Sequence, residues 1–155
     1  MTRRAAILAA LVTTMLSVPA SGAGTAAGPW ATVNLCDPAD RPGAMGVRAG
    51  VPAGPGAQWL RVRVEWYDAT ASRWTTATGG DGGWARLGDG KRGVRGGTTF
   101  TFPVPAAGRV LLLRGTVRVE WRRGKRVLRK RTVRTSAGHA AQAGGSSWAQ
   151  CVVPG

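Results

Sequence analysis

Apolar and polar residues alternate along residues 111–122, which contain the clearest pattern in the chain. Five of the six odd positions from 111 to 121 are apolar, whereas the even positions from 114 to 122 are Arg, Thr, Arg, Glu and Arg. A period of two residues is typical of a β-strand with one buried and one solvated face. Arg123-Gly124 interrupts the pattern, and glycine can adopt the positive φ that a hairpin turn often needs. The sequence therefore predicts a hairpin that returns over residues 126–135.

The return strand has a less regular pattern than its partner. No single register hides Val127, Leu128 and Val133 while it exposes every basic residue of the strand. A β-bulge would resolve this conflict, and charged side chains on an edge strand discourage edge-to-edge pairing. We therefore expect a bulged strand at the edge of its sheet.

The five residues V-R-V-E-W occur twice, at positions 62–66 and 117–121. Two copies of so short a segment are too few for a solenoid repeat. We interpret them as two central strands of one sheet that both need apolar residues on the inner face and charged residues on the outer face. Val and Trp would point inward and Arg and Glu outward, and Glu65 and Glu120 would pair with arginines across strands.

Further strands are expected at 31–36, 45–51, 60–67, 73–77, 98–102 and 148–153, because apolar residues alternate or cluster there between turn signals. Residues 78–97 are rich in glycine and are expected to be a connection, and residues 136–147 a loop of small residues. No helical periodicity follows residue 23. The predicted fold class is all-β: an antiparallel immunoglobulin-like or fibronectin III-like β-sandwich of about seven to eight strands.

The N-terminus carries the pattern of a secretory signal peptide. Two arginines precede an apolar segment at 5–18, and small residues follow it, so we expect a signal peptide helix at 1–23 with cleavage after Ala20 or Ala23. The apolar segment is shorter than the roughly 20 residues that span a bilayer, and we expect no transmembrane anchor after cleavage. Residues 24–29 are expected to be a flexible mature N-terminus and residues 30–155 a single domain. The predicted location is extracellular, with association with the cell wall as an alternative.

Cys36 and Cys151 are the only cysteines of this chain, and they are expected to form a disulfide because export exposes them to oxidising conditions. They lie on the first and last predicted strands, so a bridge would tie the two ends of the domain together. Closing such a long loop contributes about 4–5 kcal/mol at most.

The chain is strongly basic, with 22 Lys and Arg residues against 7 Asp and Glu. Removing residues 1–23 leaves 20 basic and 7 acidic residues, a net charge of +13. Such a charge attracts polyanions. Codon bias is a competing cause, because arginine greatly outnumbers lysine and the composition is that of a high-GC genome. Both explanations remain open at this point.

The outward face of the two central strands and the hairpin form the candidate polyanion-binding surface. Guanidinium groups there could bind phosphates in a forked geometry. The candidate residues are Arg61, Arg63, Arg118, Arg122, Arg123, Lys125, Arg126, Arg129, Lys130 and Arg131.

Residues for catalysis or metal binding are sparse. His139 is the only histidine, and the nearby serines lie in a loop without a nucleophile motif, so a surface histidine is expected. Asp81 and Asp89 are too few for a calcium site and are expected to occupy glycine turns. Residues 88–93 match G-x-G-x-x-G, but no βαβ unit surrounds them. We predict no enzyme activity, no cofactor and no metal.

Seven tryptophans suggest a sugar-binding platform as another idea. Trp66 and Trp121 fall on inward positions of their strands and are expected in the core. The sequence alone does not place Trp30, Trp59, Trp74, Trp84 and Trp148.

The signal peptide, the early cysteine in ATVNLC, the VEW strands, the WRRGKRV hairpin, TSAGH and Cys151 together resemble small secreted immunoglobulin-like β-sandwich proteins of high-GC Gram-positive bacteria. That group is uncharacterised, so the resemblance implies an exported β-sandwich and carries no established activity. The predicted function is a secreted, non-enzymatic interaction or structural module. The alternative is an envelope-associated protein that binds an anionic wall polymer or nucleic acid; the partner could equally be an extracellular protein.

Overall fold

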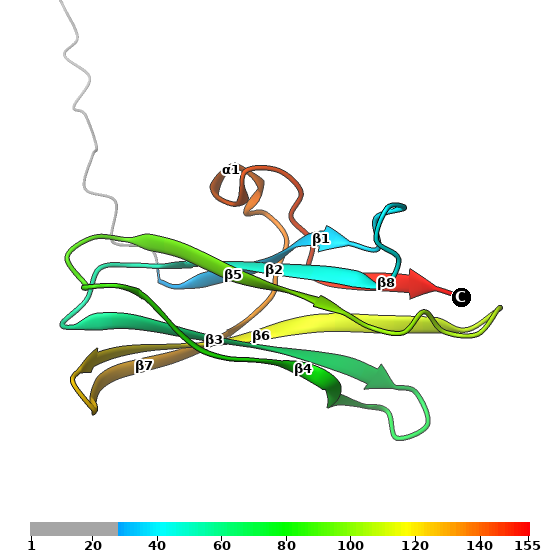
Figure 1. Ribbon diagram of the computed structural model, residues 1–155, viewed down its shortest axis with the longest axis horizontal. Coiled ribbons are helices and arrows are strands. Elements are labelled where there is room, and N and C mark those ends of the chain that lie inside the picture. The colour runs from blue at the N-terminus through cyan, green and yellow to red at the C-terminus, as the bar shows by residue number, and fades with distance from the viewer. Residues whose placement is uncertain (1–27) are drawn as a thin grey trace, which may run out of the picture.

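The computed structural model describes residues 28–155, and these residues form two antiparallel sheets that pack face to face (Figure 1). The smaller sheet has the order β1-β2-β5 and the larger sheet the order β4-β3-β6-β7, with β8 also paired to β6. The expected signal peptide at 1–23 lies outside the described residues. The strands are β1 (Trp30–Cys36), β2 (Ala44–Val51), β3 (Ala57–Asp68), β4 (Arg73–Gly88), β5 (Val94–Thr101), β6 (Val110–Arg123), β7 (Arg126–Arg134) and β8 (Gln150–Pro154).

The predicted all-β sandwich is confirmed. In a constant-type immunoglobulin domain the fourth strand joins the sheet of the first, second and fifth strands. Here β4 pairs with β3 in the larger sheet instead. This strand order differs from that of a constant-type immunoglobulin domain.

The two V-R-V-E-W segments lie in central strands of one sheet, as predicted, and these strands are neighbours. They run antiparallel in β3 and β6, with Val62 opposite Val117 and Arg61 opposite Arg118. The valines of both segments and Trp121 are at most 1% exposed and form the centre of the core. Trp121 donates a hydrogen bond from Nε1 to the carbonyl of Pro52 at 3.1 Å, so its one polar group is satisfied. Trp66 packs against the same core and is partly buried.

Strands β7 and β8 share one side of β6. β7 pairs with β6 from Thr116 to Arg123, and β8 pairs with it from Val110 to Arg114. β7 is an edge strand with a register shift opposite Trp121 and Arg122, so the predicted edge position and bulge are confirmed. The bulge lets Val133 pack against the core while the bases remain exposed.

The predicted disulfide between Cys36 and Cys151 is present, with a Cα–Cα distance of 5.3 Å. It joins the end of β1 in the smaller sheet to β8 in the larger sheet. The bridge therefore fixes the two sheets to each other beside the core, where Cys151 is fully buried.

The expected connection at 78–97 is wrong over most of its length. β4 continues to Gly88 and β5 already begins at Val94, so only a short turn separates them. The pairing of β4 with β3 contains several register shifts. Gly79 and Gly83 have positive φ values of 74° and 69°, a conformation that glycine adopts without strain. The glycines thus permit bulges within a long strand. Because each bulge interrupts the alternation of apolar and polar residues, the sequence pattern did not reveal this strand.

The loop between β7 and β8 returns across the outer side of the smaller sheet (Figure 1). It contains one short helix, α1 (Ala140–Ala143), where only irregular structure was expected. Arg48 on β2 donates a hydrogen bond to the carbonyl of Ala143 and holds the helix against the sheet. β8 then begins at Gln150, two residues later than predicted, and Trp148 forms an isolated bridge with Val33. Among residues 28–155 no helix is long and apolar enough to cross a membrane.

Candidate polyanion-binding surface

The structure divides the predicted basic residues into two groups. The first group, here called the face arginines, projects from β3 and β6 on the outer face of the larger sheet. It comprises Arg61, Arg63, Arg118 and Arg122, joined by Arg114. The second group, here called the hairpin group, belongs to the end of β6, the turn and β7. It comprises Arg123, Lys125, Arg126, Arg129, Lys130 and Arg131.

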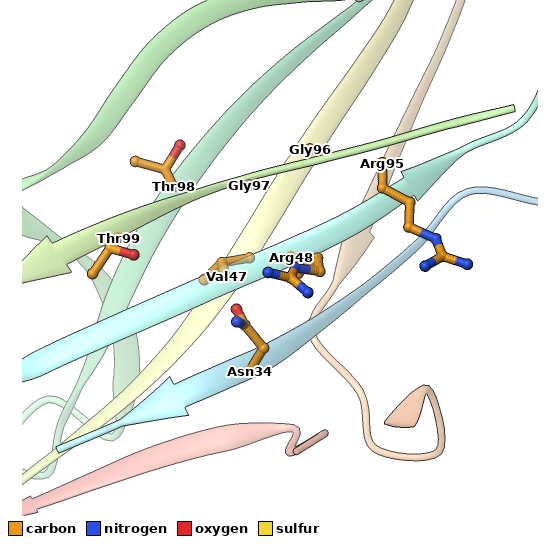
Figure 2. A pocket seen from close by; sticks show the side chains of 8 residues that line it. All are labelled: Asn34, Val47, Arg48, Arg95, Gly96, Gly97, Thr98 and Thr99. Atoms are coloured by element: carbon orange, nitrogen blue, oxygen red, sulfur yellow. The ribbon is translucent and has the colours of Figure 1, made fainter. Parts of the chain in front are cut away.

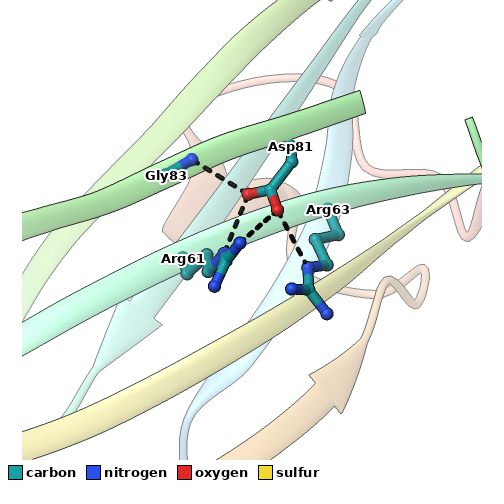
Figure 3. Close-up of polar contacts among 4 residues, drawn as sticks. All are labelled: Arg61, Arg63, Asp81 and Gly83. Atoms are coloured by element: carbon teal, nitrogen blue, oxygen red, sulfur yellow. Dashed lines mark hydrogen bonds and ion pairs between the residues drawn. The ribbon is translucent and has the colours of Figure 1, made fainter. Parts of the chain in front are cut away.

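Asp81 pairs with the first two face arginines, Arg61 and Arg63 (Figure 3). Its carboxylate accepts a forked pair of hydrogen bonds from Arg61, with 2.8 Å from Nε to Oδ1, and a third from Arg63 Nε at 3.2 Å. The backbone N–H of Gly83 adds a fourth at 3.0 Å. The hydrogen bonds from Arg61 hold the pKa of Asp81 well below its usual range, and Asp81 raises the pKa of Arg61. Asp81 was expected in a turn; it lies on β4 because the bulges place it opposite Arg63.

Glu120 pairs with the other two, Arg118 and Arg122. Its side chain is only 3% exposed, and its two oxygens contact Arg118 Nη2 at 2.7 Å and Arg122 Nη2 at 2.6 Å. Both partners lie on β6 itself, two residues before and after Glu120, so the expectation of a cross-strand partner is wrong for this residue. It is correct for Glu65, which accepts a 2.7 Å hydrogen bond from Arg114 Nε on the neighbouring strand.

Tryptophan rings cover the same guanidinium groups. Arg114 lies 4.1 Å from the centre of Trp74, and Arg122 lies 4.3 Å from Trp84 and 4.8 Å from Trp59. Stacking of this kind is favourable because the ring face is electron-rich. All three tryptophans are half-buried, and they stabilise the sheet face by stacking on its arginines. Trp59 shares the outward parity of Arg61, and this signal could have placed it from sequence.

The hairpin group has a different environment. All six side chains are exposed, and none of the ion pairs among residues 28–155 involves them. No acidic residue follows Glu120 in the sequence, although eight basic residues do. Arg129 has one defined contact, with its guanidinium 4.8 Å from the ring of Trp121. The uncompensated positive charge of the larger sheet is therefore concentrated along the hairpin.

Bases project from both sides of β7. Arg129 and Arg131 lie opposite the inward residues Trp121 and Val119, whereas Lys130 lies opposite the outward residue Glu120. Side chains two residues apart on a strand are separated by about 6.6 Å, and the nine residues of β7 extend over about 30 Å. This arrangement presents several cations on both sides of one exposed edge strand.

The expected surface histidine is more ordered than a free loop residue. The ring of His139 stacks on Trp30 at 5.0 Å, and Nε2 lies 3.1 Å from the hydroxyl of Ser136. The described residues contain no cluster of three His, Cys, Asp or Glu side chains.

The glycine-rich turn at 88–93 is bound by the protein's own groups. Gln58 is fully buried, accepts from the N–H of Gly90 at 3.2 Å and donates to the carbonyl of Arg92 at 2.8 Å. The expected turn role of Asp89 is confirmed, because its carboxylate accepts from the N–H of Lys91 at 3.0 Å. The turn's polar groups thus satisfy one another.

A hollow of about 420 Å³ lies on the outer side of the smaller sheet (Figure 2). Asn34, Arg48 and Arg95 stand around a floor formed by the backbone of Gly96 and Gly97. Arg48 is already engaged by the carbonyl of Ala143. This hollow is open and lies on the opposite side of the sandwich from the face arginines.

No protein-family model matches this chain, and no curated protein is similar to it.

Proposed function

We propose that the protein is a secreted, non-enzymatic β-sandwich that binds an anionic polymer of the cell envelope through the hairpin group. The observation that carries this proposal is the contrast in charge compensation on one sheet. Acidic side chains pair with the face arginines, whereas the hairpin group has six exposed bases and no ion pair among the described residues. The N-terminal pattern of a signal peptide supports an extracellular location.

The shape of β7 suits an extended ligand better than a compact one. The bases follow a strand about 30 Å long at the edge of the sheet. A polymer with a phosphate in each repeating unit can lie along such a strand and contact several bases in succession. Each contact releases bound counterions from the polymer, and this release supplies much of the binding free energy.

The proposal predicts binding that weakens steeply with salt. If all six bases neutralise phosphates, affinity should fall roughly 10²- to 10³-fold between 50 and 200 mM salt. The measurement is a titration of the purified, oxidised protein with a polyol-phosphate wall polymer by fluorescence anisotropy across that salt range. A neutral polysaccharide of similar length serves as the uncharged comparison ligand.

A charge-matched pair of variants makes the test specific. One variant replaces Arg126, Arg129, Lys130 and Arg131 with Gln, and the other replaces the exposed arginines Arg41, Arg73, Arg92 and Arg109 with Gln. We expect the first to lose most of the affinity and the salt dependence, and the second to retain both. Equal losses in the two variants would reduce the effect to net charge and would contradict the proposal. Tighter binding of duplex DNA than of the wall polymer would make nucleic acid the ligand instead.

A further inference from the structure

The outer face of the larger sheet contains a depression of about 190 Å³ between β3, β6 and β7. It exists because short side chains lie among long ones. Thr116 and Thr132 occupy outward positions whose neighbours along and across the strands are arginines or lysines. Three arginines and these two threonines line it: Arg61, Arg63, Arg118, Thr116 and Thr132.

The arginines around the depression are held in place, yet they keep free donors. Asp81 accepts one hydrogen bond from Arg63, from Nε, and Glu120 contacts Arg118 at Nη2. Each guanidinium carries five N–H groups, so most donors of these two side chains remain available. Their side chains are 49% and 50% exposed, which leaves these donors accessible to a ligand. Fixing a guanidinium before the ligand arrives reduces the entropy lost on binding.

The local charge is not balanced. Four arginines, at positions 61, 63, 118 and 122, share two carboxylates, those of Asp81 and Glu120. This set carries a net charge of +2, which a dianion would neutralise. The hydroxyl of Thr116 is also buried without a hydrogen-bond partner among the described residues. An unsatisfied buried hydroxyl is unusual and indicates a group that a ligand or solvent molecule completes.

We propose that this depression, here called the phosphate seat, binds a single phosphate group through Arg61, Arg63 and Arg118, with Thr116 and Thr132 completing its lining. Guanidinium forks and hydroxyl donors match the oxygens of a phosphate mono- or diester. The source of the phosphate rests on the proposed function, in which a phosphate polymer lies along the hairpin group. Thr132 lies between Lys130 and Arg134 on the outward side of β7. A polymer that follows the hairpin group passes the seat and can place one phosphate in it.

The experiment is an NMR titration of the full oxidised protein with inorganic phosphate, followed through backbone amide signals. Ionic strength is kept constant with sodium chloride, so that only specific anion binding changes the spectrum. We expect saturable shifts centred on Arg61, Thr116 and Thr132. Shifts spread evenly over all basic segments, or shifts that do not saturate, would overturn the seat.

Two variants test its parts. Thr116→Val removes the hydroxyl but keeps the shape of the side chain, and it should weaken phosphate binding about three- to tenfold. Arg63→Gln leaves the Asp81–Arg61 pair in place and should weaken binding by about tenfold or more. Thr99→Val, an exposed threonine of the smaller sheet, is the matched control and should leave the affinity unchanged. Unchanged affinity in both seat variants, with dispersed spectra that show folded protein, would overturn the proposal.

The same titration separates the seat from the hairpin group. The four-Gln hairpin variant should still shift the seat signals with inorganic phosphate, while it loses the wall polymer. Phosphate binding without polymer binding in the wild type would contradict the proposed function and leave the seat standing. Polymer binding that is lost only in the hairpin variant, without any phosphate shifts at the seat, would overturn the seat and support the proposed function.

Discussion

The face arginines and the hairpin group lie on one sheet, partly on one strand, but they differ in how many acidic and aromatic partners they have. Acidic side chains and tryptophan rings engage the face arginines, as Arg122 shows with Glu120 and two rings. In the hairpin group, by contrast, only Arg129 contacts an aromatic ring. Position in the sheet accounts for part of the difference. β3 is flanked by β4, which supplies Asp81, Trp74 and Trp84, whereas β7 has a neighbour on one side only. Glu120, by contrast, pairs with two arginines of its own strand. A net charge thus says little until its compensated and uncompensated parts are separated.

This comparison predicts that charge removal on the face destabilises the fold while charge removal on the hairpin does not. The largest effect is expected for Glu120→Gln. It leaves two arginines without their buried carboxylate and should lower the free energy of unfolding by about 2 kcal/mol. The measurement is urea unfolding followed by tryptophan fluorescence at neutral pH. Arg126→Gln is the hairpin counterpart and should change stability by less than about 0.5 kcal/mol. A loss of stability in Arg126→Gln as large as that in Glu120→Gln would contradict the predicted difference between the two groups.

A second, smaller effect is expected for the rings that cover the face. Trp84→Ala removes the surface on which Arg122 and Arg118 stack and should cost roughly 1–2 kcal/mol of stability. Trp148→Ala provides the control, because its side chain is 43% exposed and engages no arginine in the described part of the chain. Denaturant unfolding of both variants, followed by circular dichroism, should show a clear loss only for the first. Equal losses would mean that tryptophan area alone, without stacking, accounts for the effect.

The smallest effect concerns pH. Arg61 lowers the pKa of Asp81 in the folded state; a carboxyl with a lowered pKa stabilises the fold above its unfolded pKa of about 3.9, and this contribution is lost as the pH falls. Wild type should therefore exceed Asp81→Asn in stability at pH 7, by a margin that shrinks below about pH 4. Both partners are partly exposed, so the margin is modest. Urea midpoints of the two proteins between pH 7 and pH 2 provide the measurement.

The exposed pair of Asp40 and Arg41, 3.7 Å apart, serves as the control for this titration. Asp40→Asn should have a stability close to that of wild type at every pH, because such surface pairs contribute little. A margin for Asp81→Asn that stays constant down to pH 2 would show that its charge does not stabilise the fold. The face would then resemble the hairpin group in this respect.

Local patterns in the sequence determined much of the fold. Strict alternation located β3 and β6, and their identical V-R-V-E-W segments indicated that both lie in the centre of one sheet. The misfit of Val127, Leu128 and Val133 with any single register predicted the bulged edge strand. The pairing of Cys36 with Cys151 followed from their number and from the export that the N-terminal pattern predicts. The conclusions about strands depend on which face of the strand each side chain occupies, and a period of two specifies that face.

Only the tertiary structure decided which charges are compensated. Asp81 lies opposite Arg63 because bulges shift the register of β4, and the sequence signals a loop there instead. Trp74 and Trp84 reach Arg114 and Arg122 across strands that are distant in sequence. The phosphate seat likewise forms where Thr116 and Thr132 meet Arg61 and Arg118 from three strands. Contacts between strands depend on register and bulges, which local alternation does not specify, so the sequence identified the basic residues but could not divide them into structural and exposed groups.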